Sequence, residues 1–229
     1  VRLIDCVGYM VPGAVGQFED LAPRMVMTPW YDHEIPFTQA AELGTRKVIG
    51  DHSTIGIVVT TDGTIGDLKR PGYIAAERQT VEELKKLGKP FIILLNSVKP
   101  YSEETARLAK ELEETYGVSV LPVNCEQLKK EDIFHILERV LKEFPVTEMD
   151  FHIPKWLEIL PASHWLKAQV IQTVKEILQK VEHMKDVALR IREMKDESGA
   201  IKSLSVRKME MADGSVDLTV EMDDSYYYQ

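Results

Sequence analysis

Two short polar motifs follow apolar runs in this sequence, and both carry residue types that proteins use to handle phosphorylated ligands. The run Val1–Ile4 leads directly into Asp5-Cys6-Val7-Gly8. An Asp at the end of a strand can hold a magnesium ion through water, and a Gly three residues later can offer its backbone N–H to a terminal phosphate. We therefore predict that Asp5 and Gly8 are catalytic residues and that Asp5 is the metal ligand.

The second motif, at residues 96–99, follows another apolar run, and a further polar pair at 124–125 follows the next one. In chain order, these stand where a GTPase carries its Asn-Lys-x-Asp motif and its last base-contacting loop. The predicted nucleotide-binding residues are Asn96, Ser97, Lys99, Asn124 and Cys125.

Lys99 bears on which base this site would accept. Guanine is recognised by a carboxylate that accepts from its N1–H and N2–H, whereas a lysine can only donate. Losing a charged acceptor forfeits roughly 1.5–3 kcal/mol and leaves guanine donors unpaired. The sequence thus disfavours guanine, and with it a GTPase of translation or trafficking. It permits adenine but does not demonstrate an adenine contact, and a solvated Lys99 that makes no base contact stays an open alternative.

The elements that must position these residues alternate between strand and helix. Buried strands are predicted by short apolar runs, and helices by longer amphipathic segments with capping residues such as Ser102 and Gly117. Strands that are apolar on both faces indicate a parallel sheet covered by helices on both sides, with ligands at the carboxyl ends of the strands. The predicted strands are Val1–Ile4, Ile55–Thr60, Phe91–Leu95 and Val118–Val123, and the predicted helices are 37–49, 75–87, 102–116 and 131–143.

Pro145 marks the predicted domain boundary, so residues 1–145 and 146–229 are expected to form two domains. In the second, Trp165–Lys195 reads as one long helix because apolar residues recur at helical spacing. Alternation around Asp213-Gly214 predicts a hairpin of Ile201–Met211 with Ser215–Met222. The expected fold class is a mostly parallel, doubly wound α/β sheet whose N-terminal part is missing, followed by an α+β domain of long helix plus hairpin. Intramolecular packing is favoured for the apolar face of that helix over a partner contact.

Composition excludes several classes of function. The formal net charge of −9 argues against bulk binding to nucleic acid or to an anionic membrane surface. Two cysteines make no disulfide framework and suit a reducing compartment. The sequence has no signal peptide and no apolar run of about 18 residues that would predict a transmembrane segment. Because the first residue is Val rather than Met, we expect the sequence to be a fragment.

Two other groups of residues are candidates for a functional role. His33 and His52, each next to an Asp, have a spacing that fits no pair of ligands on a helix face, so a metal role is disfavoured. Trp30 lies in a long segment after Gly8. It is interpreted as an anchoring core aromatic rather than as part of a mobile switch that orders when nucleotide binds.

The stretches VRLIDCVGYMVPGA, TPWY, IPFTQAAELGTRKVI, HSTIGIVVTTDGTIGD, GKPFIILLNSVKPY and HWL together resemble the stage IV sporulation protein A family. The resemblance is dense over about residues 1–165. It implies a spore-coat morphogenetic ATPase derived from the P-loop GTPase class, so ATP and Mg²⁺ are the expected cofactors. The family's lysine-bearing phosphate loop and sensor threonines would then precede Val1, and its C-terminal assembly domain would follow Gln229. Among the motif residues, Asp5 transfers most directly.

The resemblance also implies a biological role. ATP hydrolysis would drive self-assembly into a homopolymer that forms the basement layer of the spore coat. The protein would work in the mother-cell cytoplasm at the outer surface of the forespore. A forespore membrane-surface anchor protein and spore coat proteins would be its partners. Without the phosphate loop, residues 1–229 alone are expected to be inactive. The alternative is a non-catalytic structural scaffold with a vestigial nucleotide site.

Overall fold

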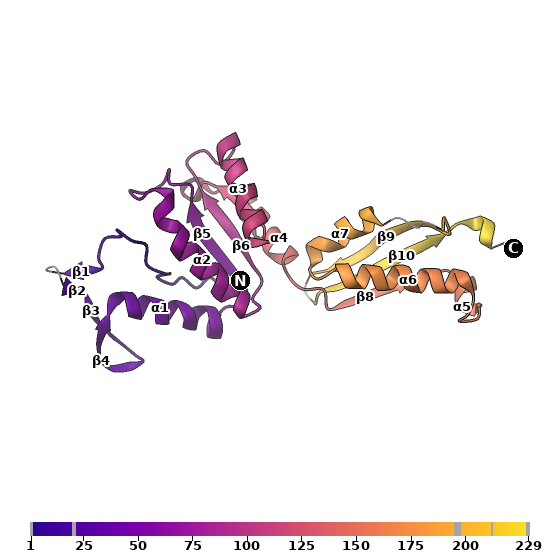
Figure 1. Cartoon of the computed structure of the whole chain (residues 1–229), viewed down its shortest axis with the longest axis horizontal. Coiled ribbons are helices and arrows are strands. Elements are labelled where there is room, and N and C mark those ends of the chain that lie inside the picture. Colours follow the sequence, from indigo (N-terminus) through magenta and orange to yellow (C-terminus); the bar gives the residue numbers. More distant parts are fainter. Residues whose placement is uncertain (1, 20–21, 195–197, 212, 228–229) are drawn as a thin grey trace. The chain divides into compact units, whose positions relative to one another are not determined.

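The computed structural model describes residues 2–19, 22–194, 198–211 and 213–227. The chain divides into two compact units, Val1–Val140 and Leu141–Gln229, called here the first and second units (Figure 1). Among the described residues, none of the helices is both long and apolar enough to cross a membrane.

The first unit contains an α/β arrangement with a small peripheral β region. Its strands are β1 (Phe18–Glu19), β2 (Ala22–Pro23), β3 (Met25–Thr28), β4 (Tyr31–Pro36), β5 (Gly56–Thr61), β6 (Phe91–Asn96) and β7 (Val120–Val123). Its helices are α1 (Phe37–Lys47), the π-helical η1 (Val48–His52), α2 (Arg70–Lys86), α3 (Glu103–Tyr116), the 3₁₀ turn η2 (Cys125–Gln127) and α4 (Lys130–Lys142).

The core of this unit is a three-stranded parallel sheet in the order β5-β6-β7. The first five residues of β6 are all buried, so the central strand is apolar on both faces. Phe91, Ile93 and Leu95 pack with residues of α2 and α3 in one cluster, while Ile92 and Leu94 are buried on the opposite face. The predicted parallel α/β sheet is therefore confirmed for these three strands.

Capping residues set the ends of α3 as the sequence predicts. The Ser102 hydroxyl accepts a hydrogen bond from the Thr105 N–H at 3.2 Å, and Gly117 ends the helix with a φ of +67°. Only glycine adopts that left-handed conformation without a steric penalty. Because α3 follows the loop at 96–102, its capped start fixes one side of the predicted base site.

The predicted strand at Val1–Ile4 is wrong for the residues that the structure describes. Residues 2–4 form no strand, and Leu3 is 82% exposed. The segment runs beside β5, but residues 4–9 and β5 line opposite sides of a cavity of about 370 Å³. That gap prevents a hydrogen-bonded ladder between the two, so an apolar composition alone does not produce a strand here.

The long segment after Gly8, predicted to be irregular, contains an unpredicted hairpin. β3 and β4 pair antiparallel, with Met25 opposite Pro36 and Thr28 opposite Tyr31. The Thr-Pro-Trp-Tyr turn joins them, and β4 runs directly into α1. The four prolines from residue 12 to residue 36 are typical of irregular structure, so the hairpin is not predicted from the sequence.

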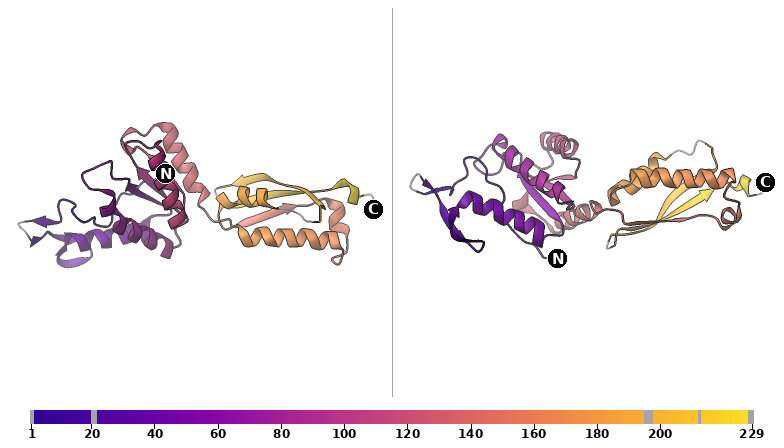
Figure 2. Two further views of the ribbon diagram at one scale, coloured as in Figure 1. Left: turned by 45° about the horizontal axis from the view of Figure 1, so that its top comes forward. Right: turned by 60° about the horizontal axis from the view of Figure 1, so that its bottom comes forward.

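The second unit is a three-stranded sheet with helices along one face, visible as the orange and yellow part of Figure 2. β8 pairs parallel with β10, and β10 pairs antiparallel with β9, giving the order β8-β10-β9. The predicted hairpin is the β9–β10 pair. The elements are β8 (Glu148–His152), α5 (Lys155–Ile159), α6 (Trp165–Lys180), α7 (Met184–Glu193), β9 (Ile201–Glu210), β10 (Ser215–Met222) and the 3₁₀ turn η3 (Asp224–Tyr226).

The single long helix predicted over Trp165–Lys195 is wrong, because the chain breaks between α6 and α7. Val181 and His183 are extended there, and the Glu182 carbonyl accepts from the Val146 N–H at 3.0 Å. A capping box between His183 and Asp186 then starts α7. One apolar face of these helices is buried against the sheet, as the preferred packing interpretation expects; its buried residues are Leu166, Val170, Ile177, Met184 and Val187.

Candidate functional site

The predicted base-binding residues are brought together at the carboxyl edge of the parallel sheet. The side-chain oxygen of Asn96, at the end of β6, accepts a hydrogen bond of 2.9 Å from the backbone N–H of Cys125. Asn124 caps η2 by accepting from the Glu126 N–H at 3.1 Å. The bond from Asn96 therefore ties the loop after β6 to the loop after β7, although 29 residues separate its two partners.

A cavity of about 550 Å³ lies between these two loops. Lys99 and Asn124 line it, with Tyr101, Gln127 and Asp132 on its other sides. Ser97 does not, because its side chain is fully buried and accepts from the Lys99 N–H at 3.0 Å. Ser97 thus shapes the loop from inside, and any contact it makes with a ligand would come through its backbone.

Asp62, which was not predicted as a site residue, organises the Asn96–Lys99 loop from the end of β5. Its carboxylate accepts from the N–H and hydroxyl of Thr64 at 2.9 and 2.6 Å, and the Thr64 hydroxyl in turn accepts from the Val98 N–H at 3.0 Å. Partial burial disfavours the charged form, but hydrogen bonds from Ser97, Thr64 and Thr105 outweigh it and lower the pKa of Asp62. Asp62 therefore stays ionised and holds the loop.

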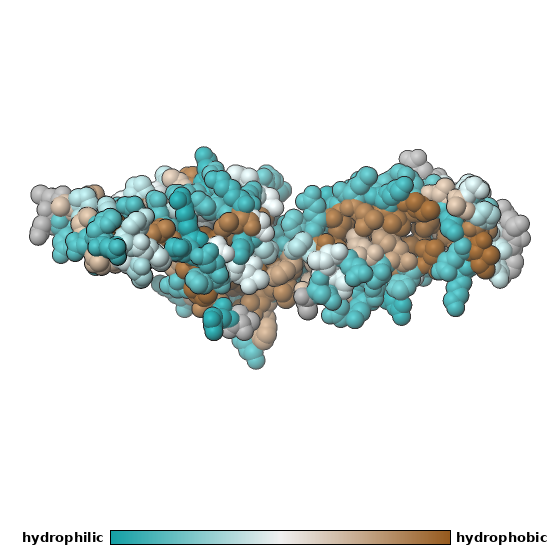
Figure 3. Space-filling view, turned by 90° about the horizontal axis from the view of Figure 1, so that it is seen from below, coloured by the Kyte–Doolittle hydropathy of each residue, from teal (hydrophilic) through white to brown (hydrophobic). Residues whose placement is uncertain are grey.

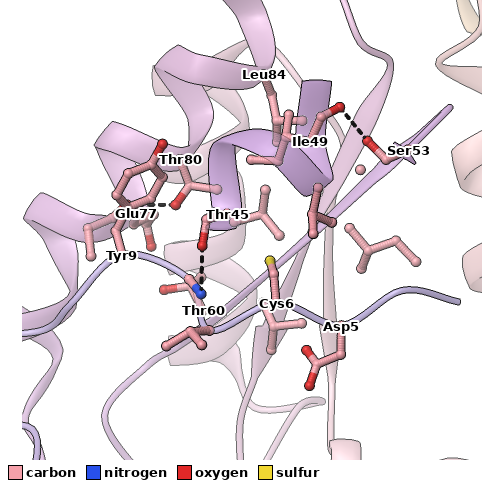
Figure 4. Close-up of a pocket in the computed structure, with 18 of the residues that line it drawn as sticks. Asp5, Cys6, Tyr9, Thr45, Ile49, Ser53, Thr60, Glu77, Thr80 and Leu84 are labelled. Atoms are coloured by element: carbon pink, nitrogen blue, oxygen red, sulfur yellow. Dashed lines mark hydrogen bonds between the residues drawn. The ribbon is translucent and has the colours of Figure 1, made fainter. Parts of the chain in front are cut away.

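The predicted phosphate-side residues, Asp5 and Gly8, lie together in a different part of the first unit. They line the cavity between residues 4–9 and β5 (Figure 4). The Asp5 carboxylate points away from the other labelled side chains in that view, and Asp5 is exposed. Asp5 and Gly8 thus line one cavity, whereas Lys99 and Asn124 line another.

The backbone N–H of Gly8 already has a partner. It donates to the hydroxyl of Thr45 on α1 at 3.0 Å, and Thr45 is only 2% exposed (Figure 4). Gly8 has a φ of +80°, which favours glycine at this turn. A phosphate that used this N–H would have to displace Thr45.

A buried ion pair fixes α2 against the carboxyl end of β5. The two guanidinium nitrogens of Arg70 contact the carboxylate of Glu77 at 2.5 and 2.9 Å, and one of them also donates to the Thr60 hydroxyl at 2.9 Å. Tyr116 of α3 donates its hydroxyl to the same carboxylate at 2.8 Å. The Arg70–Glu77 pair therefore links β5, α2 and α3.

The other candidates gain little support. Among the described residues, no group of three or more His, Cys, Asp or Glu side chains could hold a metal ion, so His33 and His52 gain no further ligands there. Trp30 is 42% exposed, and the Lys47 ammonium lies 5.9 Å from the centre of its ring. It packs on the surface of α1 and does not anchor a core.

The residues at these two cavities have chemistry that suits a magnesium–nucleotide complex. Mg²⁺ in proteins keeps several waters and uses one or two carboxylates together with substrate phosphates. A single exposed carboxylate at Asp5 meets that requirement. The other cavity offers a cation and amide groups, which suit a neutral base with acceptor nitrogens.

Comparison with known proteins places the whole chain in one family. The model described as "Stage IV sporulation protein A, ATPase domain" matches residues 1–145, and the one described as "Stage IV sporulation protein A, middle domain" matches residues 146–229. Stage IV sporulation protein A of Bacillus subtilis (strain 168) is 44% identical over 229 residues, and that of Clostridioides difficile (strain 630) is 41% identical over 228.

These two comparisons each cover 100% of this chain but 46% of the relative, so the chain spans about half the length of the relatives it matches. GTPase HflX of Thermococcus kodakarensis is a more distant relative, 26% identical over 198 residues, which cover 83% of this chain and 43% of that protein. No solved structure matches. Both domain models and the near relatives agree, and the chain therefore belongs to the stage IV sporulation protein A family.

Proposed function

We propose that the full-length protein binds ATP with Mg²⁺ in the first unit and hydrolyses it to ADP and phosphate. The observation that carries this proposal is the bond from the Cys125 N–H to Asn96, which joins two loops around one cavity. The cavity lies at the carboxyl edge of a parallel sheet, where such folds bind ligands. The ATPase-domain description of the matching family model supports the choice of reaction.

Lys99 would favour adenine in this cavity because its ammonium group can donate to an adenine ring nitrogen. Replacing it by an acceptor, Lys99→Asp, should move relative affinity toward GTP by about ten- to a hundred-fold. Competition binding of ATP and GTP measures this ratio. Lys110→Asp, an exposed position on α3, is the charge-matched control. An unchanged ratio in a folded Lys99→Asp protein would place base selection elsewhere. Ser97 is left intact because a larger side chain would not fit its buried position.

Asp5 would hold the Mg²⁺ whose charge neutralises the transferring phosphoryl group. Asp5→Asn should lower ATP turnover by at least about a hundredfold. It should leave the free energy of unfolding nearly unchanged, since Asp5 is exposed. Asp67→Asn, at another exposed aspartate, is the matched control. Parental turnover by Asp5→Asn would remove Asp5 from the site.

We further propose that hydrolysis drives self-assembly into the basement layer of the spore coat. Assembly would occur at the forespore surface in the mother-cell cytoplasm, with a surface anchor protein and coat proteins as partners. Membership in a family of sporulation proteins supports this proposal. Light scattering with ATP, with ADP and with a non-hydrolysable ATP analogue tests it. Equal assembly in all three would disconnect assembly from hydrolysis.

A non-catalytic scaffold is the second candidate, and one observation favours it. The Gly8 N–H that would bind a phosphate is held by Thr45. The printed sequence also contains no Gly-x-x-x-x-Gly-Lys-Ser/Thr motif, so residues 1–229 alone should bind ATP weakly and not hydrolyse it. Assembly by the full-length protein without ATP turnover would identify a scaffold.

A further inference from the structure

The sheet of the second unit has two edges that pair with no other strand among residues 141–194, 198–211 and 213–227. β8 forms one edge and β9 the other, with β10 between them. An unpaired edge presents a row of backbone N–H and C=O groups that can pair with a strand of another chain. β9 is ten residues long and β8 five, so each offers several backbone hydrogen bonds.

The two edges carry opposite charge. β8 contains the exposed Glu148 and Asp150 and no Lys or Arg, a formal charge of −2. β9 contains one acidic residue, Glu210, against three basic ones, a formal charge of 3 − 1 = +2. The three basic residues are Lys202, Arg207 and Lys208.

These charges discriminate between the ways in which two copies could join. Two β8 edges, or two β9 edges, would set like charges side by side, whereas a β8 edge beside a β9 edge sets opposite charges together. Cross-strand pairs of this kind are worth about 0.2–1 kcal/mol each, with the sign set by the charges. The unlike pairing is therefore favoured.

The strand directions allow this pairing to repeat. β8 runs parallel to β10 and β9 runs antiparallel to it. A second copy in the same orientation thus places its β8 antiparallel to the β9 of the first, and one sheet continues through both. Such a head-to-tail contact leaves a free edge at each end, so it generates a linear assembly.

An apolar strip accompanies the β8 edge. On α6, Ile171 is 43% exposed and Leu178 is 50% exposed, with Val174 half-buried between them. Glu176 and Lys180 line a cavity against α7, so the helical spacing puts the apolar strip on the flank of α6 away from α7. α7 lies over β9, which leaves this flank on the β8 side of the sheet. Figure 3 shows a band of apolar side chains on this unit.

We propose that the β8 edge of one copy pairs with the β9 edge of a second copy, and that the incoming copy covers the apolar strip on α6. The inference names the contact for the self-assembly proposed above and rests on it. It does not depend on ATP hydrolysis.

Charge reversal in the full-length protein tests the pairing. One variant reverses β8 (Glu148→Lys with Asp150→Lys), and the other reverses β9 (Arg207→Glu with Lys208→Glu). Each variant alone has two edges of like sign and should need at least about tenfold more protein than the parent to assemble, measured by light scattering and sedimentation. An equimolar mixture of the two should assemble like the parent, because every basic edge then meets an acidic one.

A matched control and a crosslink complete the test. Glu111→Lys with Glu114→Lys, at exposed positions of α3, makes the same change in net charge as the β8 reversal and should assemble normally. Mixed Asp150→Cys and Ser205→Cys proteins should form a disulfide between these two positions on oxidation. Mass spectrometry maps it against the parent, in which Cys6 and Cys125 are already free thiols.

The outcomes separate the two proposals. Assembly of both reversal variants at parental concentration, or disulfides that join β8 to β8, would overturn the edge pairing while self-assembly stands. A parent that hydrolyses ATP but never assembles would overturn the edge pairing and self-assembly together, and would leave the ATPase proposal intact.

Discussion

Removing the charge of Glu77 should cost the first unit about 3 kcal/mol of unfolding free energy. Glu77 is 4% exposed and receives two hydrogen bonds from Arg70 and one from Tyr116. Breaking a buried ion pair by deleting one partner costs about 3–5 kcal/mol, because the remaining charge is left without compensation. The Arg70 side chain is 16% exposed, so water reaches part of it and the lower end of that range applies. Glu77→Gln removes the charge and keeps the shape.

Urea denaturation of the full-length protein, followed by far-ultraviolet circular dichroism, measures this loss. Glu83→Gln is the matched control, since Glu83 pairs with a half-exposed Arg46 at 3.2 Å and such surface pairs contribute about 0–1 kcal/mol. In an Arg70→Met background, Glu77→Gln should lower the unfolding free energy by less than it does in the parent, because no buried guanidinium is then left without its partner. Equal costs of Glu77→Gln and Glu83→Gln, or strict additivity with Arg70→Met, would refute the argument.

Ionisation of Glu77 should also make the unfolding free energy fall at acidic pH. Burial raises the pKa of Glu77, but hydrogen bonds from Arg70 and Tyr116 and the Arg70 charge outweigh it, so the pKa in the folded state is lowered. The stabilisation is therefore complete above the unfolded-state pKa of about 4.3 and is lost as pH falls through the folded-state value. Stability curves of the parent and Glu77→Gln should converge on acidification. Parallel curves would show that the ionised carboxylate is not the source.

Three other substitutions test separate parts of the structure. Burial and then the bond to Glu77 raise the pKa of Tyr116 to about 12, above an unfolded-state value of about 10. The stabilisation should therefore be complete below about pH 10 and be lost as pH rises through about 12. Tyr116→Phe should reduce this alkaline loss of stability, measured by urea titrations at each pH. Asp62→Asn should weaken ATP binding by about three- to tenfold, measured by calorimetry, with Asp67→Asn unchanged. Gly214→Ala should destabilise the second unit by about 1–3 kcal/mol. Gly214 has a φ of +76°, and a Cβ there would lie 2.8 Å from the Pro145 carbonyl oxygen. An unchanged urea midpoint would contradict this.

Local signals predicted the parts of the fold that depend on neighbouring residues. The Ser102 cap, the Gly117 stop and the all-apolar run of β6 each act within a few residues, and all three are found in the structure. The helix break before Met184 was missed because its cap is a histidine, which lies outside the usual capping residues. The false strand at 1–4 shows the opposite error, since a strand needs a partner that composition does not supply.

The site was predictable only where strand ends carried polar residues. Asn96, Lys99 and Asn124 are predicted from that position and from the chain order of GTPase motifs. In the structure, Lys99 and Asn124 line one cavity, and Asn96 makes the bond that joins its two loops. Asp62 also follows a strand, but its bond network to Thr64 and the next loop depends on tertiary contact. The Arg70–Glu77 ion pair could not be predicted from the sequence, because its burial depends on how α2 and α3 pack.

The bond between Gly8 and Thr45 makes two contacts mutually exclusive. Any anion that recruits the Gly8 N–H takes it from a hydroxyl that is 2% exposed, and so loosens residues 5–9 from α1. By thermodynamic reciprocity, whatever strengthens the contact of α1 with this segment weakens the anion's affinity by the same factor. Helix α1 continues from the β3–β4 hairpin. A force or a partner that moves this hairpin, and α1 with it, relative to residues 5–9 would therefore change the affinity of an anion for the Gly8 N–H.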